Sequence, residues 1–179
     1  MEMGAKNSVL TGAAGEHYVL YHLHRRGLLA AQSPTGAYGA DILVFSPAMG
    51  VGSMVQVKTR TLGEGGGWRM RQTHETLLHP RLFYAFVDLQ PEQPVVYVVP
   101  SEIVVDVLTK THRAWLATPG KGGRPHRDSK VRRILPWLPS PLPGYEGPWL
   151  EAYRDRWDLL TEAPRLEEDI ESKKTRPRR

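Results

Sequence analysis

Two short apolar runs with a turn-rich break between them constrain the fold of this chain more than any other feature. Residues 38–45 read Tyr-Gly-Ala-Asp-Ile-Leu-Val-Phe, and residues 54–60 read Met-Val-Gln-Val-Lys-Thr-Arg. Both are rich in β-branched and aromatic residues, and the break contains proline and glycine, which is typical of two strands joined by a loop. Because successive side chains of a strand alternate between its faces, Gln56 and Lys58 point the same way. A hairpin would bring Asp41 to the same end of the sheet.

An acid, an amide and an amine in strands this apolar need a physical explanation. Burying an ionised side chain without a partner is costly, so such groups are usually paired, bound to a metal or functional. The two strands alone leave two explanations open. Either the three side chains form a site, or Asp41 is a turn residue after Gly39 and Lys58 is a strand-end lysine that reaches solvent.

A helix is predicted over residues 7–27, and it brings a further acid toward the strands. Cap residues stand at its start, no proline interrupts it, and a glycine follows two arginines at its end. Residues spaced three and four apart form one face, which is apolar except for its acid: Val9, Ala13, Glu16, Leu20, Leu23 and Gly27. We therefore expect Glu16 to point toward the sheet and join the polar residues of the strands.

The order of these side chains resembles the PD-(D/E)xK nuclease superfamily, the restriction-endonuclease-like fold that also contains archaeal Holliday-junction resolvases. In that family a leading helix carries a Glu, the next strand a metal-binding Asp, and the following strand an acid-x-Lys triplet. The matching residues of this chain, in order, are Glu16, Asp41, Gln56 and Lys58. The resemblance covers residues 8–100. It implies an α/β fold with a restriction-endonuclease-like mixed β-sheet core flanked by helices.

Two positions depart from the family's pattern. Ala40 precedes Asp41 where the family often has Pro, and Gln56 stands where Asp or Glu is usual. Some members have Gln at that place, so the change does not exclude activity. It removes one negative charge, so the chain would offer a divalent cation two carboxylates instead of three. Weaker metal binding is expected.

The resemblance implies an endonuclease that hydrolyses phosphodiester bonds in DNA and depends on Mg²⁺ or Mn²⁺. Asp41, the amide oxygen of Gln56 and the backbone carbonyl of Val57 would bind the cation. Glu16 would bind it directly or through water. Lys58 would orient or help deprotonate the attacking water and offset charge developing at phosphorus. Because no stretch identifies a base-reading element, structure-selective or weakly sequence-specific cleavage is expected.

The distribution of charge favours a polyanionic partner. The formal net charge is +5, and basic residues gather in residues 110–133 around a Gly- and Pro-rich segment, residues 118–125. Such a loop can present cations and backbone N–H groups to phosphates, although an ordinary solvated loop has the same composition. DNA is the expected partner, with RNA not excluded. The expected nucleic-acid-binding residues are Arg60, Arg69, Arg71, Lys121, Arg124, Arg127, Lys130, Arg132 and Arg133.

The remaining stretches complete the predicted organisation. Residues 82–89 and 95–100 are continuously apolar, which is typical of strands covered on both faces. A helix follows, capped by Ser101 and with Ile103, Val104, Val107, Leu108 and Trp115 as its apolar side. A Pro-rich strap over residues 134–148 leads to a helix predicted over residues 148–160. Its expected buried stripe is Trp149, Leu150, Tyr153, Trp157 and Leu160.

Three parts are therefore predicted. Residues 1–116 would form the nuclease-like core, and residues 117–162 a basic loop, Pro-rich strap and helix packed on it. Residues 163–179 would form a charged flexible tail.

Composition excludes several classes of protein. The absence of cysteine excludes a disulfide framework and a thiolate metal site. No apolar run approaches the ~20 residues that span a bilayer, and the start lacks a secretory pattern, so a cytoplasmic protein that binds no membrane is expected. Two alternatives to an enzyme stay open. One is a non-catalytic nucleic-acid-binding module on a degenerate nuclease fold. The other is a small interaction protein whose strap serves a partner or a homodimer.

Overall fold

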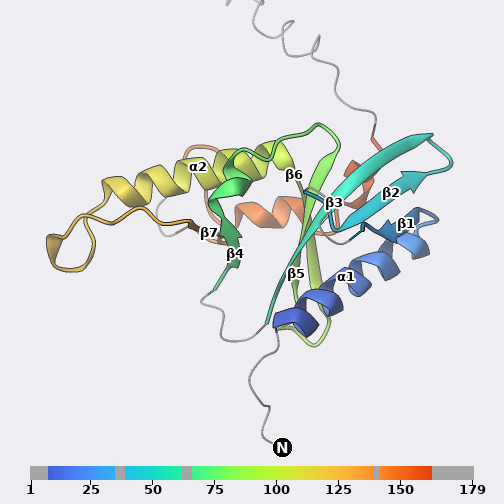
Figure 1. The fold of residues 1–179 in the computed structure, drawn as a ribbon, viewed down its shortest axis with the longest axis horizontal. Helices are drawn as coiled ribbons and strands as arrows, with labels where there is room; N and C mark the ends of the chain where they lie inside the picture. Colours follow the sequence, from blue (N-terminus) through green and yellow to red (C-terminus); the bar gives the residue numbers. More distant parts are fainter. Residues whose placement is uncertain (1–7, 35–38, 62–65, 139–141, 163–179) are drawn as a thin grey trace, which may run out of the picture.

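The centre of the computed structural model is a five-stranded mixed sheet with a helix on each face (Figure 1). The structure describes residues 8–34, 39–61, 66–138 and 142–162. In spatial order the strands are β1 (Leu29–Gln32), β2 (Ile42–Ser46), β3 (Val51–Arg60), β5 (Leu82–Asp88) and β6 (Val95–Pro100). Within this sheet β3 and β5 run parallel, and the other neighbours are antiparallel. The predicted mixed sheet flanked by helices is confirmed.

The predicted hairpin is formed by β2 and β3. Ile42 pairs with Val55, and Ser46 pairs with Val51. The turn is shorter than the predicted break, because β3 begins at Val51 and Gly50 adopts a left-handed backbone with φ of 63°. Residues 56–60 of β3 extend beyond its pairing with β2. This uneven length leaves room beside the second half of β3 for residues from other elements.

The sheet separates two apolar clusters, and β5 contributes to both. Its even-numbered residues Leu82, Tyr84 and Phe86 share one cluster with Val104, Val107 and Leu108 of α2 (Ser101–Ala117). Its odd-numbered residues Phe83, Ala85 and Val87 share the other with Val19 and Leu23 of α1 (Ser8–Arg25). All seven residues of β5 are buried, as predicted for a strand covered on both faces.

The inward face of α1 differs from the predicted one. Its buried residues are Gly15, Val19 and Leu23, whereas Val9 is 75% exposed. A Cβ atom on Gly15 would lie 1.8 Å from Thr59 Oγ1, so the helix backbone lies directly against β3 at this point. Glycine is required there because any side chain would collide with the strand. The next residue, Glu16, is thereby held close to the second half of β3.

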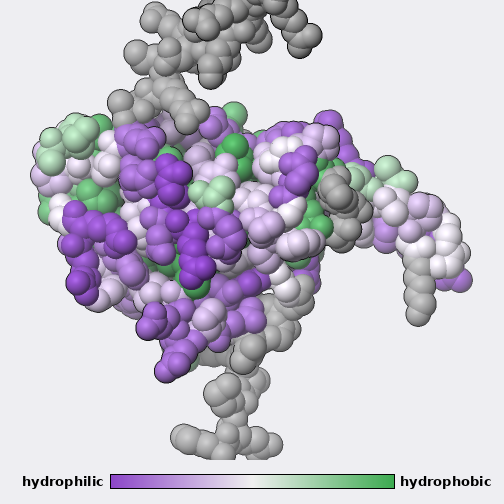
Figure 2. Space-filling view, turned by 180° about the vertical axis from the view of Figure 1, so that it is seen from behind, coloured by the Kyte–Doolittle hydropathy of each residue, from purple (hydrophilic) through white to green (hydrophobic). Residues whose placement is uncertain are grey.

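A second, two-stranded antiparallel sheet consists of β4 (Trp68–Arg71) and β7 (Val131–Ile134) (Figure 1). Its inner residues, Trp68, Met70, Arg132 and Ile134, are buried. Its outer residues, Arg69, Arg71, Val131 and Arg133, are exposed. A short 3₁₀ helix, η1 (Gln72–Glu75), follows β4 directly. The loop after α2, which includes η2 (Lys121–Gly123), projects from the body of the molecule (Figure 1, and at the right of Figure 2).

The helix predicted over residues 148–160 is wrong in type. The segment forms two 3₁₀ helices, η3 (Trp149–Tyr153) and η4 (Trp157–Leu160). Between them Arg154 makes a β-bridge with Tyr97, the Asp155 N–H donates to Val96 O at 2.9 Å, and Asp155 has a φ of 53°. The backbone here binds the edge of β6, which a continuous helix could not do. The predicted stripe is nevertheless buried at Trp149, Leu150, Trp157 and Leu160, with Tyr153 half-buried.

Two further details of α2 and the strap correct the sequence analysis. The N-cap of α2 is Pro100, and the Ser101 hydroxyl instead donates to His79 O at 2.9 Å. Trp115, predicted to belong to the apolar side, is 41% exposed. In the strap Leu138 and Tyr145 are buried, whereas residues 139–141 lie outside the described residues, as does the predicted tail. No helix in the described part of the chain is long and apolar enough to cross a membrane.

Candidate functional site

Asp41 and Gln56 meet across the β2–β3 pair. Asp41 lies one residue before β2, and its N–H extends the ladder by donating to Val55 O at 2.9 Å. Its Oδ2 accepts a hydrogen bond from Gln56 Nε2 and a second one, of 2.7 Å, from the Val57 N–H. The carboxylate therefore lies beside β3 just before β2 begins. The structure brings Asp41 and Gln56 together, as the strand pattern predicted, and adds the Val57 N–H as a donor to Asp41.

The backbone at Ala40 and Asp41 is held by a serine, Ser33, that the sequence analysis did not single out. Ser33 Oγ donates to Ala40 O, and the Ser33 N–H donates to Asp41 O at 2.9 Å. Ser33, which follows β1, thus donates to the carbonyls of both Ala40 and Asp41. This arrangement restricts the backbone from which the Asp41 carboxylate projects.

Lys58 follows Gln56 on the same face of β3 and is half-buried. Burial lowers the pKa of its amine, the charges of Asp41 and Glu16 act in the opposite direction, and Arg71 lowers it further. Lys58 therefore lies within electrostatic range of both acids and of an arginine from β4. A lowered pKa increases the fraction of unprotonated amine near neutral pH, and that is the form able to accept a proton.

Glu16 approaches from the other side of the sheet. Gln56 and Lys58 stand beside Tyr84 and Phe86 on the face that packs against α2, whereas α1 covers the opposite face. Because β2 begins only at Ile42, opposite Val55, α1 can reach β3 past the open end of the hairpin. Glu16 Oε2 accepts a hydrogen bond of 3.0 Å from Gln32 Nε2, so this carboxylate is tied to β1. Glu16 acts on Lys58 through the negative charge of its carboxylate, which raises the pKa of the lysine.

A buried histidine beside Lys58 was missed by the sequence analysis. His74, in η1, places Nδ1 2.9 Å from the hydroxyl of Tyr84, which is the β5 neighbour of Gln56. Burial lowers the pKa of His74 to about 4, and the charges of Lys58 and Arg71 act in the same direction. The imidazole is therefore neutral at neutral pH. The burial of His74 is hard to predict from the sequence, because a short 3₁₀ helix shows no regular spacing of apolar residues.

The ligands that this site offers a metal are oxygens. Two carboxylates, Asp41 and Glu16, and the amide oxygen of Gln56 suit the hard cations Mg²⁺ and Mn²⁺ in chemical type. Among the described residues, no three His, Asp or Glu side chains are grouped closely enough to hold a metal ion. The donor set thus fits such a cation in kind, with an amide in place of a third charged ligand.

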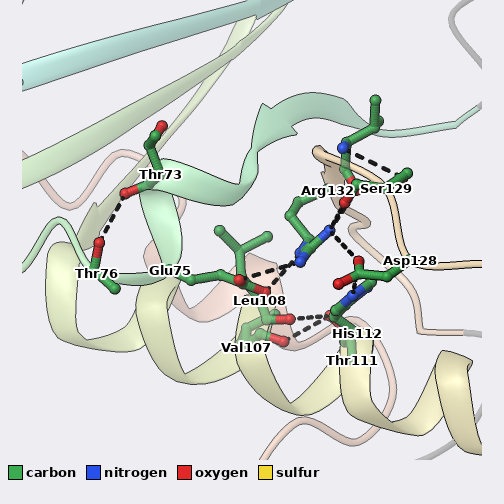
Figure 3. Close-up of polar contacts among 11 residues, drawn as sticks. Thr73, Glu75, Thr76, Val107, Leu108, Thr111, His112, Asp128, Ser129 and Arg132 are labelled. Atoms are coloured by element: carbon green, nitrogen blue, oxygen red, sulfur yellow. Dashed lines mark hydrogen bonds and ion pairs between the residues drawn. The ribbon is translucent and has the colours of Figure 1, made fainter.

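Two of the nine predicted nucleic-acid-binding residues have a structural role instead. The buried Arg60 guanidinium donates to Asp88 Oδ2 at 2.5 Å and lies 4.1 Å from the centre of the Trp68 ring. Arg132 is also buried, and its Nε donates to Glu75 Oε1 at 2.6 Å (Figure 3). Neither guanidinium lies on the surface, where a DNA phosphate would bind. The prediction for these two arginines is wrong because each has a distant acidic partner that the sequence alone does not reveal.

The other predicted basic residues whose side chains the structure describes are exposed. Arg69, Arg71 and Arg133 are on the outer face of the β4–β7 sheet, where Arg69 stands directly opposite Arg133. Exposed positions before β7 are occupied by Arg124, Arg127 and Lys130. The backbone of Lys121 lies in η2, and its side chain is outside the described part of the structure. A basic surface therefore begins at Arg71, beside Lys58, and continues along β4 and β7.

Comparison with known proteins finds a remote similarity to solved structures. No protein-family model matches the chain, and no curated protein matches it. Among solved structures it is similar to a bacterial homing endonuclease, I-Ssp6803I, with a TM-score of 0.49 and 13% sequence identity. That match covers 96% of this chain and 100% of the other. A similarity this remote carries no functional argument, so the geometry of the site must supply one.

Proposed function

We propose that this protein is a metal-dependent endonuclease that hydrolyses phosphodiester bonds in DNA, with Mg²⁺ or Mn²⁺ as its cation. The observation that supports the proposal best is the contact of the Asp41 carboxylate with Gln56 and the Val57 N–H, next to the half-buried Lys58. Helix α1 adds the charge of Glu16 to the same surroundings. An acid, an amide and an amine thus meet where a strand pair ends.

In this proposal the side chains have separate tasks. Asp41, the Gln56 amide oxygen and the Val57 carbonyl would bind the cation, and Glu16 would bind it directly or through water. A bound divalent cation lowers the pKa of a coordinated water and stabilises charge on the phosphate oxygens. Lys58 would orient the attacking water and offset the charge that develops at phosphorus. Its lowered pKa increases the fraction of neutral amine, which is the form that would accept the water's proton.

The outer face of the β4–β7 sheet would hold the DNA backbone. Arg69 and Arg133 are directly opposed across the two strands. Both side chains are exposed on this face of the sheet. Arg71 continues the surface to Lys58, which would bring a bound phosphate toward the site. Contacts of this kind recognise the backbone and not the bases, which supports structure-selective or weakly sequence-specific cleavage.

A second candidate function is a non-catalytic nucleic-acid-binding module on a degenerate nuclease site. It is favoured by the amide at position 56, whose Nε2 donates to Asp41 in the structure, and by the missing third charged ligand. This candidate predicts salt-sensitive DNA binding without metal dependence or cleavage.

The experiment that separates the two candidates is a cleavage assay. Purified protein is incubated with supercoiled plasmid, four-way junctions and flap DNA in Mg²⁺ or Mn²⁺. Asp41→Asn and Lys58→Ala should abolish cutting while the protein stays folded, and Glu92→Gln, an exposed acid in the β5–β6 turn, should leave it unchanged. Cleavage that persists in both site variants would remove the nuclease assignment.

A further inference from the structure

One face of β1 and β2 is left open by the helix that covers the rest of that side of the sheet. Leu29 stands opposite Phe45, and Leu43 stands opposite Met54. Residues paired across neighbouring strands share a face, and Met54 packs against the cluster that contains α2. Leu29, Leu43 and Phe45 therefore lie on the α2 side. Helix α2 itself packs on β5 and β6 and extends away from β1 and β2 (Figure 1).

The open face is apolar. Leu29 is 61% exposed, Leu43 47% and Phe45 44%, and Met49, in the turn of the β2–β3 hairpin that borders the face, is 61% exposed. Hydrophobic side chains are visible at this end of the molecule, on the left of Figure 2. Together the four side chains expose roughly 450 Å², which is within the range of the largest apolar patch on a typical monomer. Patches of this size often bind a partner.

The chemistry of this surface excludes a polyanion as its partner. A hollow of about 300 Å³ lies along it, and the described residues that line the hollow include no Lys, Arg, Asp or Glu. Its one titratable side chain, His24, already places Nε2 2.9 Å from Ala30 O. DNA is held chiefly by cations on its phosphates, and this surface offers none. The occupant must therefore bind through apolar contact.

The C-terminal segment of the chain is unsuited to cover the open face. Residues 163–179 lie outside the described structure, and the large apolar residues among them are Leu166 and Ile170. Most of the others are charged. Placing such a segment on an apolar surface would take charges out of water without partners, which is costly.

The open face is instead suited to an identical face. Each of its two central large side chains has a small residue beside it, Ala31 next to Leu43 and Gly52 next to Phe45. Large and small positions thus alternate, so the side chains of a second copy can fit between those of the first, as in two packed sheets. A standard interface buries about 800 Å² on each partner. The four exposed side chains would supply roughly half of that area, and their neighbours in β1 and the hairpin the remainder.

We propose that the open face of β1 and β2 is a homodimer interface, in which a second copy of this chain packs its own Leu29, Leu43 and Phe45 across a two-fold axis. Such an interface is isologous, with the same patch on both copies. It lies on the sheet and not on the Pro-rich strap, where Leu138 and Tyr145 are already buried within one copy. Asp41 precedes Leu43 by two residues, on the same side by strand alternation. The partner copy would therefore adjoin the candidate site.

Sedimentation velocity of the full chain over a micromolar concentration series tests the proposal. The mass of the wild-type chain should rise from 20.2 kDa toward twice that value. Phe45→Glu and Leu29→Glu should each weaken dimerisation by about a hundredfold, because the two-fold axis brings the introduced charges together in an apolar contact. Leu10→Glu, which changes a leucine of similar exposure (66%) on α1, should leave dimerisation unchanged. A wild-type chain that stays monomeric, or equal dimerisation of Phe45→Glu, Leu29→Glu and wild type, would overturn the proposal.

A second measurement does not depend on how the charged variants fold. The chain has no cysteine, so Leu43→Cys introduces a single thiol into the open face. Its alkylation by a maleimide should slow as the protein concentration rises, because the second copy covers it. The thiol of Leu10→Cys, on α1, should react at the same rate throughout. An alkylation rate at position 43 that does not depend on concentration would also overturn the inference. Because neither measurement involves DNA or metal, a dimer that fails to cleave DNA would support this inference and refute the nuclease alone.

Discussion

Gln56 Nε2 donates a hydrogen bond to Asp41 Oδ2 across the β2–β3 pair, at the position where a second carboxylate would face the first. An amide can donate to the acid beside it, whereas two carboxylates at this distance would repel each other. The pair is therefore stable without a cation. An amide at position 56 also attracts a cation less strongly than a carboxylate would. The first prediction follows from this difference.

Gln56→Glu should strengthen metal binding. The variant restores a third negative charge, and affinity for a hard cation rises with the charge of its ligands, so we expect the Kd for Mn²⁺ to fall by about tenfold. In metal-free buffer the variant should be less stable than the wild type because the two acids repel. Isothermal titration with Mn²⁺ measures the first effect and urea unfolding the second. Gln93→Glu, in an exposed turn, is the matched control. Equal Mn²⁺ affinity in Gln56→Glu and wild type would favour the degenerate binding module.

Gly15→Ala should destabilise the fold. The new Cβ would lie 1.8 Å from Thr59 Oγ1, so the helix or the strand must move, at a cost of about 1–3 kcal/mol. Gly12→Ala is the control in the same helix, because a Cβ there meets no atom within 4 Å. It should stabilise the protein by about 0.5–1 kcal/mol through helix propensity. Urea unfolding measures both, and equal stability of the two variants would show that α1 does not touch β3 at Gly15.

His74 should make stability depend on pH below neutrality. Its pKa is about 4 in the folded protein and 6.5 in an unfolded chain, so the unfolded state binds the extra proton first. Stability should therefore fall as the pH drops from 6.5 toward 4, by about 3 kcal/mol. Urea midpoints measured across this range should show a smaller decrease for His74→Gln than for the exposed control His17→Gln. Identical slopes would mean that His74 is not buried as described.

Buried and exposed arginines should respond in opposite ways to truncation. Arg60→Ala leaves Asp88 buried without its partner and should cost about 3–5 kcal/mol of stability. Arg69→Ala, on the outer face of β4, should leave stability within about 0.5 kcal/mol of the wild type. It should instead weaken DNA binding and reduce the slope of log K against log salt by about 1. Thermal unfolding and a salt titration of DNA binding check the pair, and an unchanged salt slope would exclude Arg69 from the DNA interface.

Local pattern predicted much of the site because local geometry forms it. Strand alternation places Gln56 and Lys58 on one face, and the short connection between β2 and β3 requires Asp41 to lie opposite Gln56. The parallel β3–β5 pairing, in contrast, joins segments separated by a long connection. The contact of His74 with Tyr84 depends on that pairing, so it could not be predicted from local pattern.

Charge patterns alone were a poor guide to individual arginines. Arg60 and Arg132 occur in basic stretches, yet each has an acidic partner far along the chain, Asp88 and Glu75. The inward face of α1 was predicted at partly wrong residues for a related reason. An apolar residue such as Val9 indicates the core only if the sheet extends beneath it. The closest contact with the sheet is made by Gly15, and because glycine has no side chain, the apolar pattern of the helix does not indicate this contact.

The most direct test of the central claim is an anomalous difference map from crystals soaked in Mn²⁺ at a concentration that supports cleavage. The account predicts one peak at about 2.1–2.2 Å from an Asp41 carboxylate oxygen and from the Gln56 amide oxygen, with Glu16 on the same ion directly or through water. A map without density between Asp41 and Gln56, or with the ion bound elsewhere, would contradict it.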